Sequence, residues 1–118
     1  YRTRIRTSKS DIPYFPKKSI RLMKIQTTRC FFKEYNLLDI FIKIKDKEKY
    51  FWIVDEKDPV LKSVPAYFYE NRTRVHFNGY DYLVPEKFED YLTYRYGDWK
   101  QVQKDYHYKK DDHAIINS

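Results

Sequence analysis

The chain has 118 residues, which is enough for one domain but not for two. Its 24 basic and 17 acidic residues give a net charge of +7, which favours anionic partners, although an ordinary solvated lysine surface would give the same value. No stretch approaches the ~18 apolar residues of a membrane-spanning helix. The single cysteine, Cys30, excludes an intrachain disulfide and a cysteine zinc site, and is expected to be a small core residue.

The N-terminal residues 1–7 alternate as a β-strand does. One face would carry Tyr1, Thr3, Ile5 and Thr7, and the other face would be basic, with Arg2, Arg4 and Arg6. Pro13 and Pro16 interrupt the alternation, because proline cannot donate to a strand ladder. Residues 20–26 fit a second strand, although a helix fits them nearly as well. That strand would share one face among Ile20, Leu22 and Lys24.

The strongest predicted strand covers residues 37–44. Its wholly apolar face would consist of Leu38, Ile40, Ile42 and Ile44. A charged turn over residues 45–49 leads into the apolar residues 50–54, so the two stretches predict an antiparallel hairpin with a buried face. Residues 60–69 are ambiguous because Pro65 interrupts them.

Residues 72–84 predict a second hairpin, because Asn78-Gly79 is a preferred two-residue turn between alternating stretches. Residues 84–99 then predict one helix with both ends marked. The marks are Pro85 and the acidic Glu86, Glu89 and Asp90 at the start, and Arg95 and Gly97 at the end. Its apolar stripe would consist of Phe88, Tyr91, Leu92 and Tyr96.

The stretch from Phe77 to Trp99 resembles the C-terminal signature of the LicD family, which includes the fukutin-type proteins. In that family an F-x-G turn leads to V-P, an aromatic residue, Y-L and Y-G. The matching residues here are Phe77, Gly79, Val84-Pro85, Phe88, Tyr91-Leu92 and Tyr96-Gly97, followed by Trp99, Lys104, Tyr106, Tyr108 and Asp111-Asp112. The resemblance extends from about Leu37 to the end of the chain.

The resemblance implies an α+β fold, a partial nucleotidyltransferase-like domain of mostly antiparallel strands and hairpins with a C-terminal helix. Residues 1–118 would be one segment, the C-terminal part of a LicD-like transferase, with an irregular tail over residues 100–118. Such an enzyme is a metal-dependent phosphotransferase. It moves phosphocholine or a pentitol phosphate from a CDP-linked donor to a glycan acceptor, such as a cell-surface polysaccharide, lipopolysaccharide or teichoic acid.

Asp39 is the candidate catalytic and metal-binding residue. From the pattern alone, a carboxylate between Leu38 and Ile40 is either buried, where it needs a partner or a metal, or more commonly faces solvent or pairs with a nearby arginine. The run L-D-I-F around it resembles a strand of the LicD family, which implies that Asp39 is the third carboxylate of a Mg²⁺ site. Mg²⁺ suits carboxylate and phosphate oxygens and stabilises the leaving nucleotide.

The chain departs from the family in one respect, because it has no D-x-D pair before this strand. The only acidic residues there are Asp11 and Glu34. The pair is therefore expected upstream of this sequence, and the segment alone is expected to be inactive. Asp111-Asp112-His113 predicts a solvated acidic spot rather than a metal site, because a loose tail does not fix ligand geometry.

Arg21 and Lys24 are the candidate substrate-binding residues, because basic side chains contact phosphate oxygens. The alternative function is a non-catalytic basic module that binds nucleic acid or an anionic glycan, although no known nucleic-acid module is recognisable. In that alternative the stacking residues would be Tyr14, Phe15 and Phe31. The compartment stays open, with the cytoplasm expected for a bacterial protein and the Golgi lumen for a eukaryotic one.

Overall fold

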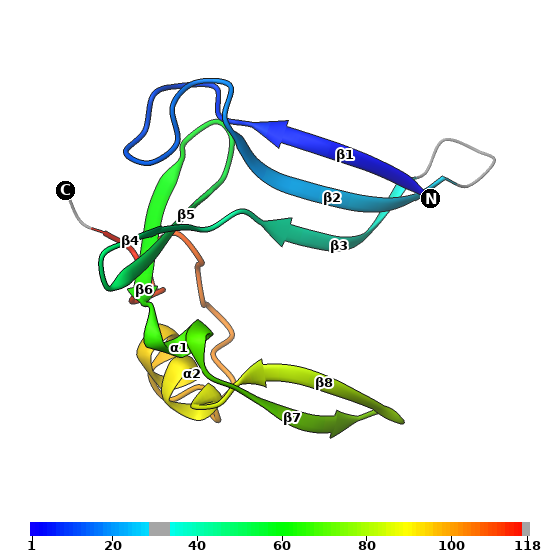
Figure 1. The fold of residues 1–118 in the computed structure, drawn as a ribbon, viewed down its shortest axis with the longest axis vertical. Helices are drawn as coiled ribbons and strands as arrows, with labels where there is room; N and C mark the ends of the chain where they lie inside the picture. Colours follow the sequence, from blue (N-terminus) through cyan, green and yellow to red (C-terminus); the bar gives the residue numbers. More distant parts are fainter. Residues whose placement is uncertain (29–33, 117–118) are drawn as a thin grey trace. The chain divides into compact units, whose positions relative to one another are not determined.

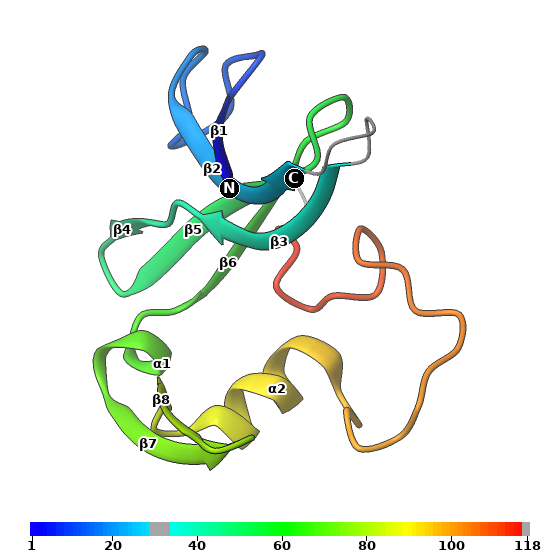
Figure 2. The same ribbon diagram turned by 90° about the vertical axis from the view of Figure 1, so that its right-hand side faces the viewer.

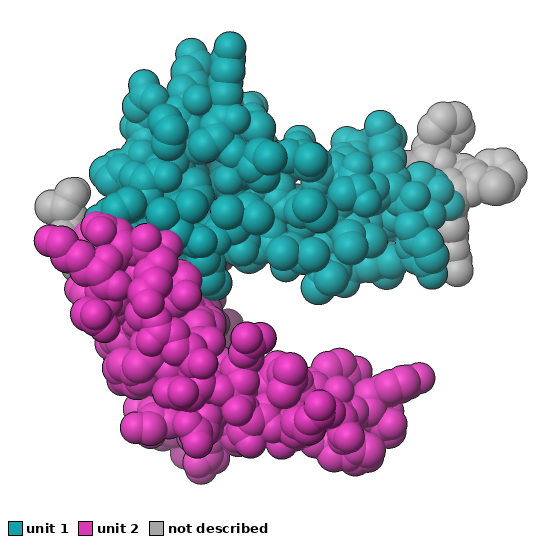
Figure 3. Space-filling view, viewed as in Figure 1, with its two compact units in different colours: residues 1–44, 51–62 teal, residues 45–50, 63–118 magenta. Residues whose placement is uncertain are grey.

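A computed structural model describes residues 1–28 and 34–116 of the chain. The chain divides into two compact units (Figure 3). Unit 1 consists of residues 1–44 and 51–62, and unit 2 of residues 45–50 and 63–118. The predictions for Cys30 and Phe31 fall outside the described residues.

The main sheet of unit 1 is antiparallel and has the strand order β1-β2-β3 (Figure 1). Its strands are β1 (Arg2–Thr7), β2 (Ile20–Thr28) and β3 (Glu34–Phe41). The strand predicted over residues 1–7 is confirmed, and residues 20–26 form a strand rather than a helix. The register places Arg4 opposite Lys24 and Lys24 opposite Asp39, so these three side chains follow one another across one face of the sheet.

The core of unit 1 is aromatic, as a chain with 13 Tyr and 8 Phe requires. Phe15, Phe51 and Trp52 are buried, and Tyr14 stacks on Phe51 with ring centroids 4.1 Å apart. The ammonium of Lys43 lies 3.3 Å from the centroid of the Trp52 ring, which is a close cation–π contact. These rings give unit 1 its apolar interior beside the largely exposed sheet.

A second sheet has the strand order β4-β5-β6. Its strands are β4 (Ile44–Asp46), β5 (Lys49–Val54) and β6 (Val60–Pro65). The hairpin predicted between residues 37–44 and 50–54 is wrong in its pairing, because β3 ends at Phe41 and pairs with β2. The backbone N–H of Ile42 donates to the carbonyl of Arg21, which marks the point where the predicted strand breaks.

Unit 2 contains a hairpin that leads into a helix (Figures 1 and 2). Its elements are α1 (Tyr67–Glu70), β7 (Arg72–Phe77), β8 (Tyr80–Pro85) and α2 (Phe88–Tyr96). The predicted turn is confirmed, since Asn78 and Gly79 have φ of 50° and 82°. The helix begins later than predicted, because Pro85 closes β8 opposite Arg72 rather than opening α2.

The tail after α2 has no regular secondary structure, but specific contacts hold it against the rest of unit 2. Asp112 is only 2% exposed and receives hydrogen bonds from the guanidinium of Arg95 on α2. The N–H of His113 donates to the carbonyl of Arg95 over 2.9 Å, and the N–H of Ser63 donates to the carbonyl of Ala114 over 2.8 Å. The prediction of a solvated acidic spot is therefore wrong at Asp112, which is an anchor of the tail.

Aromatic side chains surround this anchor. Arg95 donates to the hydroxyl of Tyr91 over 3.0 Å, and the hydroxyls of Tyr91 and Tyr69 lie 2.9 Å apart. Burial raises the pKa of Tyr69 and that of Tyr96, and raises the pKa of Tyr106 to about 12. The side chains of these three tyrosines therefore stay protonated and neutral in the folded protein to a higher pH than in the unfolded chain.

The expected α+β fold, a partial nucleotidyltransferase-like domain, is contradicted. Antiparallel strands dominate the described residues, and the two helices there hold 4 and 9 residues. Helices of this number and length do not form the helical layer of an α+β domain. The described part of the chain is a small, mostly β structure with one C-terminal helix of nine residues.

Asp112→Asn is expected to destabilise the protein, because it leaves the charge of Arg95 without its partner. Removing one member of a buried ion pair costs about 3–5 kcal/mol, and we expect about 3 kcal/mol because 16% of the Arg95 side chain is exposed. Urea unfolding followed by circular dichroism measures the loss. The matched control is Asp105→Asn, an exposed carboxylate of the same tail, and an equal loss in both variants would contradict the assignment.

Tyr106→Phe is expected to lose less stability than the wild type does when the pH rises above 10. Because the pKa of Tyr106 is about 12 in the folded chain and about 10 in the unfolded chain, the folded state is favoured below pH 10 and loses that advantage as the pH rises towards 12. At pH 7 the variant should be as stable as the wild type or more so, because the buried hydroxyl has no hydrogen-bond partner among the described residues.

Melting temperatures between pH 7 and pH 11.5 test this expectation. Tyr80→Phe is the control, because that ring is 69% exposed on the hairpin. The burial-raised pKa values of Tyr69 and Tyr96 leave part of the alkaline slope in every variant. Identical pH profiles for the wild type and Tyr106→Phe would show that Tyr106 does not titrate differently on folding.

Candidate functional site

Asp39 lies in the middle of β3 and is held by two neighbours in unit 1. The side-chain amide of Asn36 donates to one carboxylate oxygen over 2.7 Å, and the ammonium of Lys24 lies 3.6 Å from the other. Lys24 is its direct partner in the register of β2 and β3. The structure therefore brings Asp39 and Lys24 together as a cross-strand ion pair.

The alternative that Asp39 is a buried carboxylate does not hold. Its side chain is 32% exposed, and the flanking Leu38 and Ile40, which point to the opposite face of β3, are 51% and 41% exposed. Apolar neighbours in sequence suggested burial, but every residue of β3 is exposed. Asp39 is instead a partly exposed carboxylate with a cationic partner, which is the commoner situation for an acidic residue in a strand. Its partner is a lysine rather than the predicted arginine.

Arg21 does not join this pair. It lies three residues before Lys24, so the two side chains leave opposite faces of β2. Arg21 is 5% exposed, and its guanidinium is 4.0 Å from Glu56. A hydrogen bond from Lys9 lowers the pKa of Glu56, so that carboxylate is held in its charged form. Of the two predicted substrate-binding residues, only Lys24 lies beside Asp39.

The basic face of β1 is partly neutralised. Glu34 on β3 accepts hydrogen bonds from Arg4 over 2.7 Å and from Arg2 over 3.3 Å. Together with Lys24 and Asp39, these side chains form a polar surface on which charges of both signs alternate. The surface keeps more cations than anions, which suits a phosphate-bearing ligand better than a free metal ion.

A metal ion would need more ligands than the described residues supply. Among residues 1–28 and 34–116, no group of three His, Cys, Asp or Glu side chains is arranged to hold one. Asp39 offers a single carboxylate with an ammonium beside it. Mg²⁺ in proteins is usually held by one or two carboxylates together with substrate phosphates and water, so Asp39 supplies at most one of the ligands and the described residues do not form a complete Mg²⁺ site by themselves.

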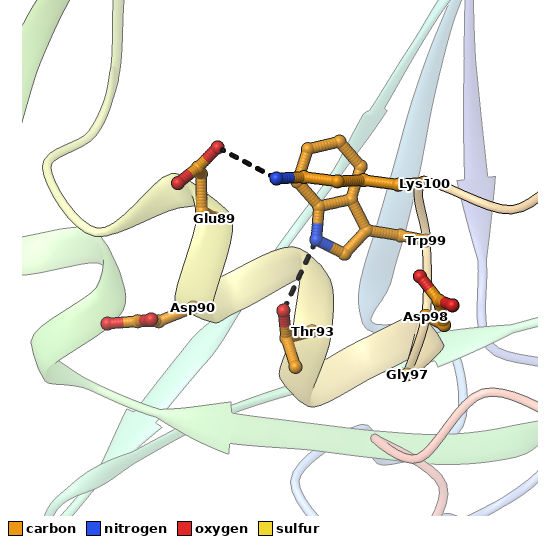
Figure 4. A pocket seen from close by; sticks show the side chains of 7 residues that line it. All are labelled: Glu89, Asp90, Thr93, Gly97, Asp98, Trp99 and Lys100. Carbon is orange, nitrogen blue, oxygen red and sulfur yellow. Dashed lines mark hydrogen bonds and ion pairs between the residues drawn. The ribbon is translucent and has the colours of Figure 1, made fainter.

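A cleft of about 430 Å³ lies in unit 2 alongside α2, from the first turn of the helix to the residues that follow its end (Figure 4). We call it the Trp99 cleft. Its lining consists of Glu89, Asp90, Thr93, Gly97, Asp98, Trp99 and Lys100.

The local sequence explains how the cleft is built. Glu89, Thr93 and Gly97 are spaced four residues apart, so they follow one side of α2 and its end. Gly97 has a φ of 66°, and Trp99 donates from its backbone N–H to the carbonyl of Gly97 over 2.8 Å. This turn brings the indole of Trp99 back alongside the helix, where its Nε1 donates to Thr93 Oγ1 over 3.2 Å.

The Trp99 cleft is acidic, although the chain is basic. Three carboxylates and one ammonium line it, which gives a formal charge of −2. The ammonium of Lys100 lies 3.8 Å from Glu89 and 5.3 Å from the centroid of the Trp99 ring. Figure 4 shows the Lys100 side chain passing across the indole, while Asp90 extends in another direction.

Sequence reasoning missed this cleft. The sequence predicts a helix-dipole role for the acidic residues of α2 and a helix end at Gly97, and it places Trp99 only as a member of the LicD-like run, with no binding role. The available signal was the polar side of the helix followed by a turn and an indole. That signal is weak, because it does not say whether the indole returns to the helix or leaves it.

The chain was compared with protein-family models, with curated proteins and with solved structures, and none of the three comparisons finds a match. The LicD resemblance therefore stays a prediction made on the motif residues. Within the part of the chain that is described, neither helix has the length and apolar character needed to cross a membrane.

Asp39→Asn is expected to change the stability of this chain by less than about 1 kcal/mol. Both side chains of the Lys24–Asp39 pair are partly exposed, at 26% and 32%, and ion pairs that water reaches contribute about 0–1 kcal/mol. The free energy of unfolding in urea measures the change. A loss of several kcal/mol would mean that Asp39 is a structural residue, and its replacement would then say nothing about a functional role.

Proposed function

We propose that this chain is the C-terminal part of a LicD-like transferase. The enzyme would move phosphocholine or a pentitol phosphate from a CDP-linked donor to a hydroxyl of a glycan. The observation that carries the proposal is the run from Phe77 to Trp99, in which a tight turn, a proline, a helix and a glycine follow in the order of the LicD signature.

The local geometry of this run supports the proposal, because the signature residues sit at special backbone positions. Gly79 and Gly97 both have positive φ, which side chains other than glycine rarely adopt. Pro85 closes the strand before the helix. Tyr91 takes part in the hydrogen-bond cluster around Arg95. Glycine at a hairpin turn and at a helix end is common to many folds, so the support comes from the order and spacing of these positions along the run.

The proposed reaction is a single displacement at phosphorus. The acceptor hydroxyl oxygen forms a bond to the phosphorus that carries the alcohol, and the bond from that phosphorus to the bridging oxygen breaks. CMP leaves with the electron pair, and the hydroxyl proton passes to a base or to water. We assign Lys24 to the donor phosphates, because its partly exposed ammonium lies beside Asp39.

By resemblance, Asp39 would hold Mg²⁺ together with an acidic pair that this sequence does not contain. When bound, the metal would neutralise phosphate charge and stabilise the leaving nucleotide. The described residues do not form that site alone, so the proposal concerns a longer protein that carries the pair. Arg21 is assigned a structural role here, because it is buried beside Glu56.

A second candidate function is a basic module that binds nucleic acid or an anionic glycan. The observation in its favour is the row of Arg2, Arg4 and Arg6 on one face of an exposed sheet. Such binding would weaken steeply with added salt and would need no metal. Glu34 already pairs with two of these arginines, which makes this function the less favoured of the two.

Release of CMP tests the transferase directly. The longer protein is incubated with CDP-choline or CDP-ribitol, Mg²⁺ and a glycan acceptor, and CMP is followed for the wild type and for Asp39→Asn. We expect CMP release to fall at least about 100-fold in the variant, because the general effect of losing a group that stabilises transition-state charge is of that order. Melting temperatures of the two proteins should agree.

Asp58→Asn is the matched control, since Asp58 is another exposed carboxylate of unit 1. Equal CMP release by the wild type and Asp39→Asn would remove Asp39 from the mechanism. No CMP from any CDP-linked donor, together with salt-sensitive binding of nucleic acid, would replace the transferase by the basic module.

A further inference from the structure

The Trp99 cleft has no part in the chemistry assigned to Asp39 and Lys24. We propose that it binds a neutral sugar or alditol residue of a glycan, with one face of that residue stacked on the indole of Trp99. The identification of this glycan as the acceptor rests on the proposed transferase function. The binding itself does not need transfer to occur.

The state of the indole is the first argument. The chain has two tryptophans, and Trp52 is a core residue that is 2% exposed. Trp99 is only half-buried and lines a hollow, although its ring is fixed by the hydrogen bond to Thr93. A ring that is held in place and faces a hollow is preorganised for a ligand.

The chemistry of the lining is the second argument. The face of an aromatic ring carries partial negative charge, and the C–H bonds on one side of a sugar ring or an alditol chain carry partial positive charge. Carboxylates such as Glu89 and Asp98 accept hydrogen bonds from hydroxyl groups, and the ammonium of Lys100 donates them. An aromatic floor with a few polar groups around it matches a polyhydroxylated ligand.

The charge of the cleft is the third argument, because it excludes the other substrate. Three carboxylates against one ammonium leave a charge of −2, which repels the diphosphate of a CDP-linked donor. A neutral ligand does not meet that repulsion. The cleft therefore suits the uncharged partner of the transfer, and the cationic sheet of unit 1 suits the phosphorylated one.

Lys100 does not block the site. Its side chain is 68% exposed and that of Glu89 is 62% exposed, so water screens their ion pair and the pair holds the ammonium only weakly. A ligand that stacks on Trp99 can therefore displace the ammonium. The same ammonium can then turn to a ligand hydroxyl, because a lysine side chain has free rotation about its four-carbon stem.

Binding is tested on an array of neutral glycans that covers hexoses, hexosamines and immobilised ribitol, probed with the labelled 118-residue chain. We expect the wild type to bind a subset of the spots and Trp99→Ala to bind the same spots up to about tenfold more weakly, since one aromatic stacking contact has that order of effect. Tyr80→Ala is the matched control, because Tyr80 is an exposed aromatic residue of unit 2 that does not line the cleft.

Glu89→Gln is a second variant that keeps the indole in place and removes one acceptor charge. It should weaken binding to the same spots by less than Trp99→Ala does. Circular dichroism and melting temperatures confirm that the variants fold. A wild type that binds no spot, or a Trp99→Ala variant that binds as well as the wild type, would overturn the proposal.

The cleft and the transferase fail in distinguishable ways. CMP release by the longer protein without Trp99-dependent glycan binding would remove the cleft proposal alone. Trp99-dependent binding without CMP release would remove the transferase alone. If glycans do not bind but choline chloride quenches the fluorescence of Trp99 in the Trp52→Phe variant, the cleft is a site for an ammonium group, and the carbohydrate proposal is wrong.

Discussion

The ion pair between Arg95 and Asp112 connects the last turn of α2 to a tail that has no regular structure of its own. Two opposite charges can stay in such a buried place only together, because each would be costly alone. The tail begins at Gly97, and the turn there sets the position of Trp99 against Thr93. The geometry of the Trp99 cleft therefore depends on the same segment that the ion pair holds in place.

The other candidate site depends on a weaker pair. Lys24 supplies a positive charge beside Asp39, which is the electrostatic role that a divalent metal would have at this carboxylate. A metal would have to compete with that ammonium, and further carboxylates would have to favour it. The ammonium of Lys24 is partly exposed and lies 3.6 Å from the carboxylate, so the pair is compatible with a site that is completed by other residues and by the donor.

The elements that were predicted correctly are those whose structure depends on residues close together in the sequence. The alternation of residues 1–7 and the Asn78-Gly79 turn depend on neighbours in sequence, and both are confirmed. The partner of β3 could not be predicted, because an apolar alternating stretch fits any strand of matching face. The burial of Asp112 escaped for a related reason, since it is decided by Arg95, seventeen positions away, and not by the residues around it.

Two contacts of the tail each close a loop of the chain, and each closure costs conformational entropy. The hydrogen bond from Ser63 to Ala114 closes a loop of some fifty residues, and the Arg95–Asp112 pair closes a much shorter loop inside it. The entropic cost of closing a loop grows only slowly with its length, so closing the inner loop first lowers the cost of the outer contact only slightly. Each contact must therefore offset most of its own ordering cost, and the order of the tail depends on both.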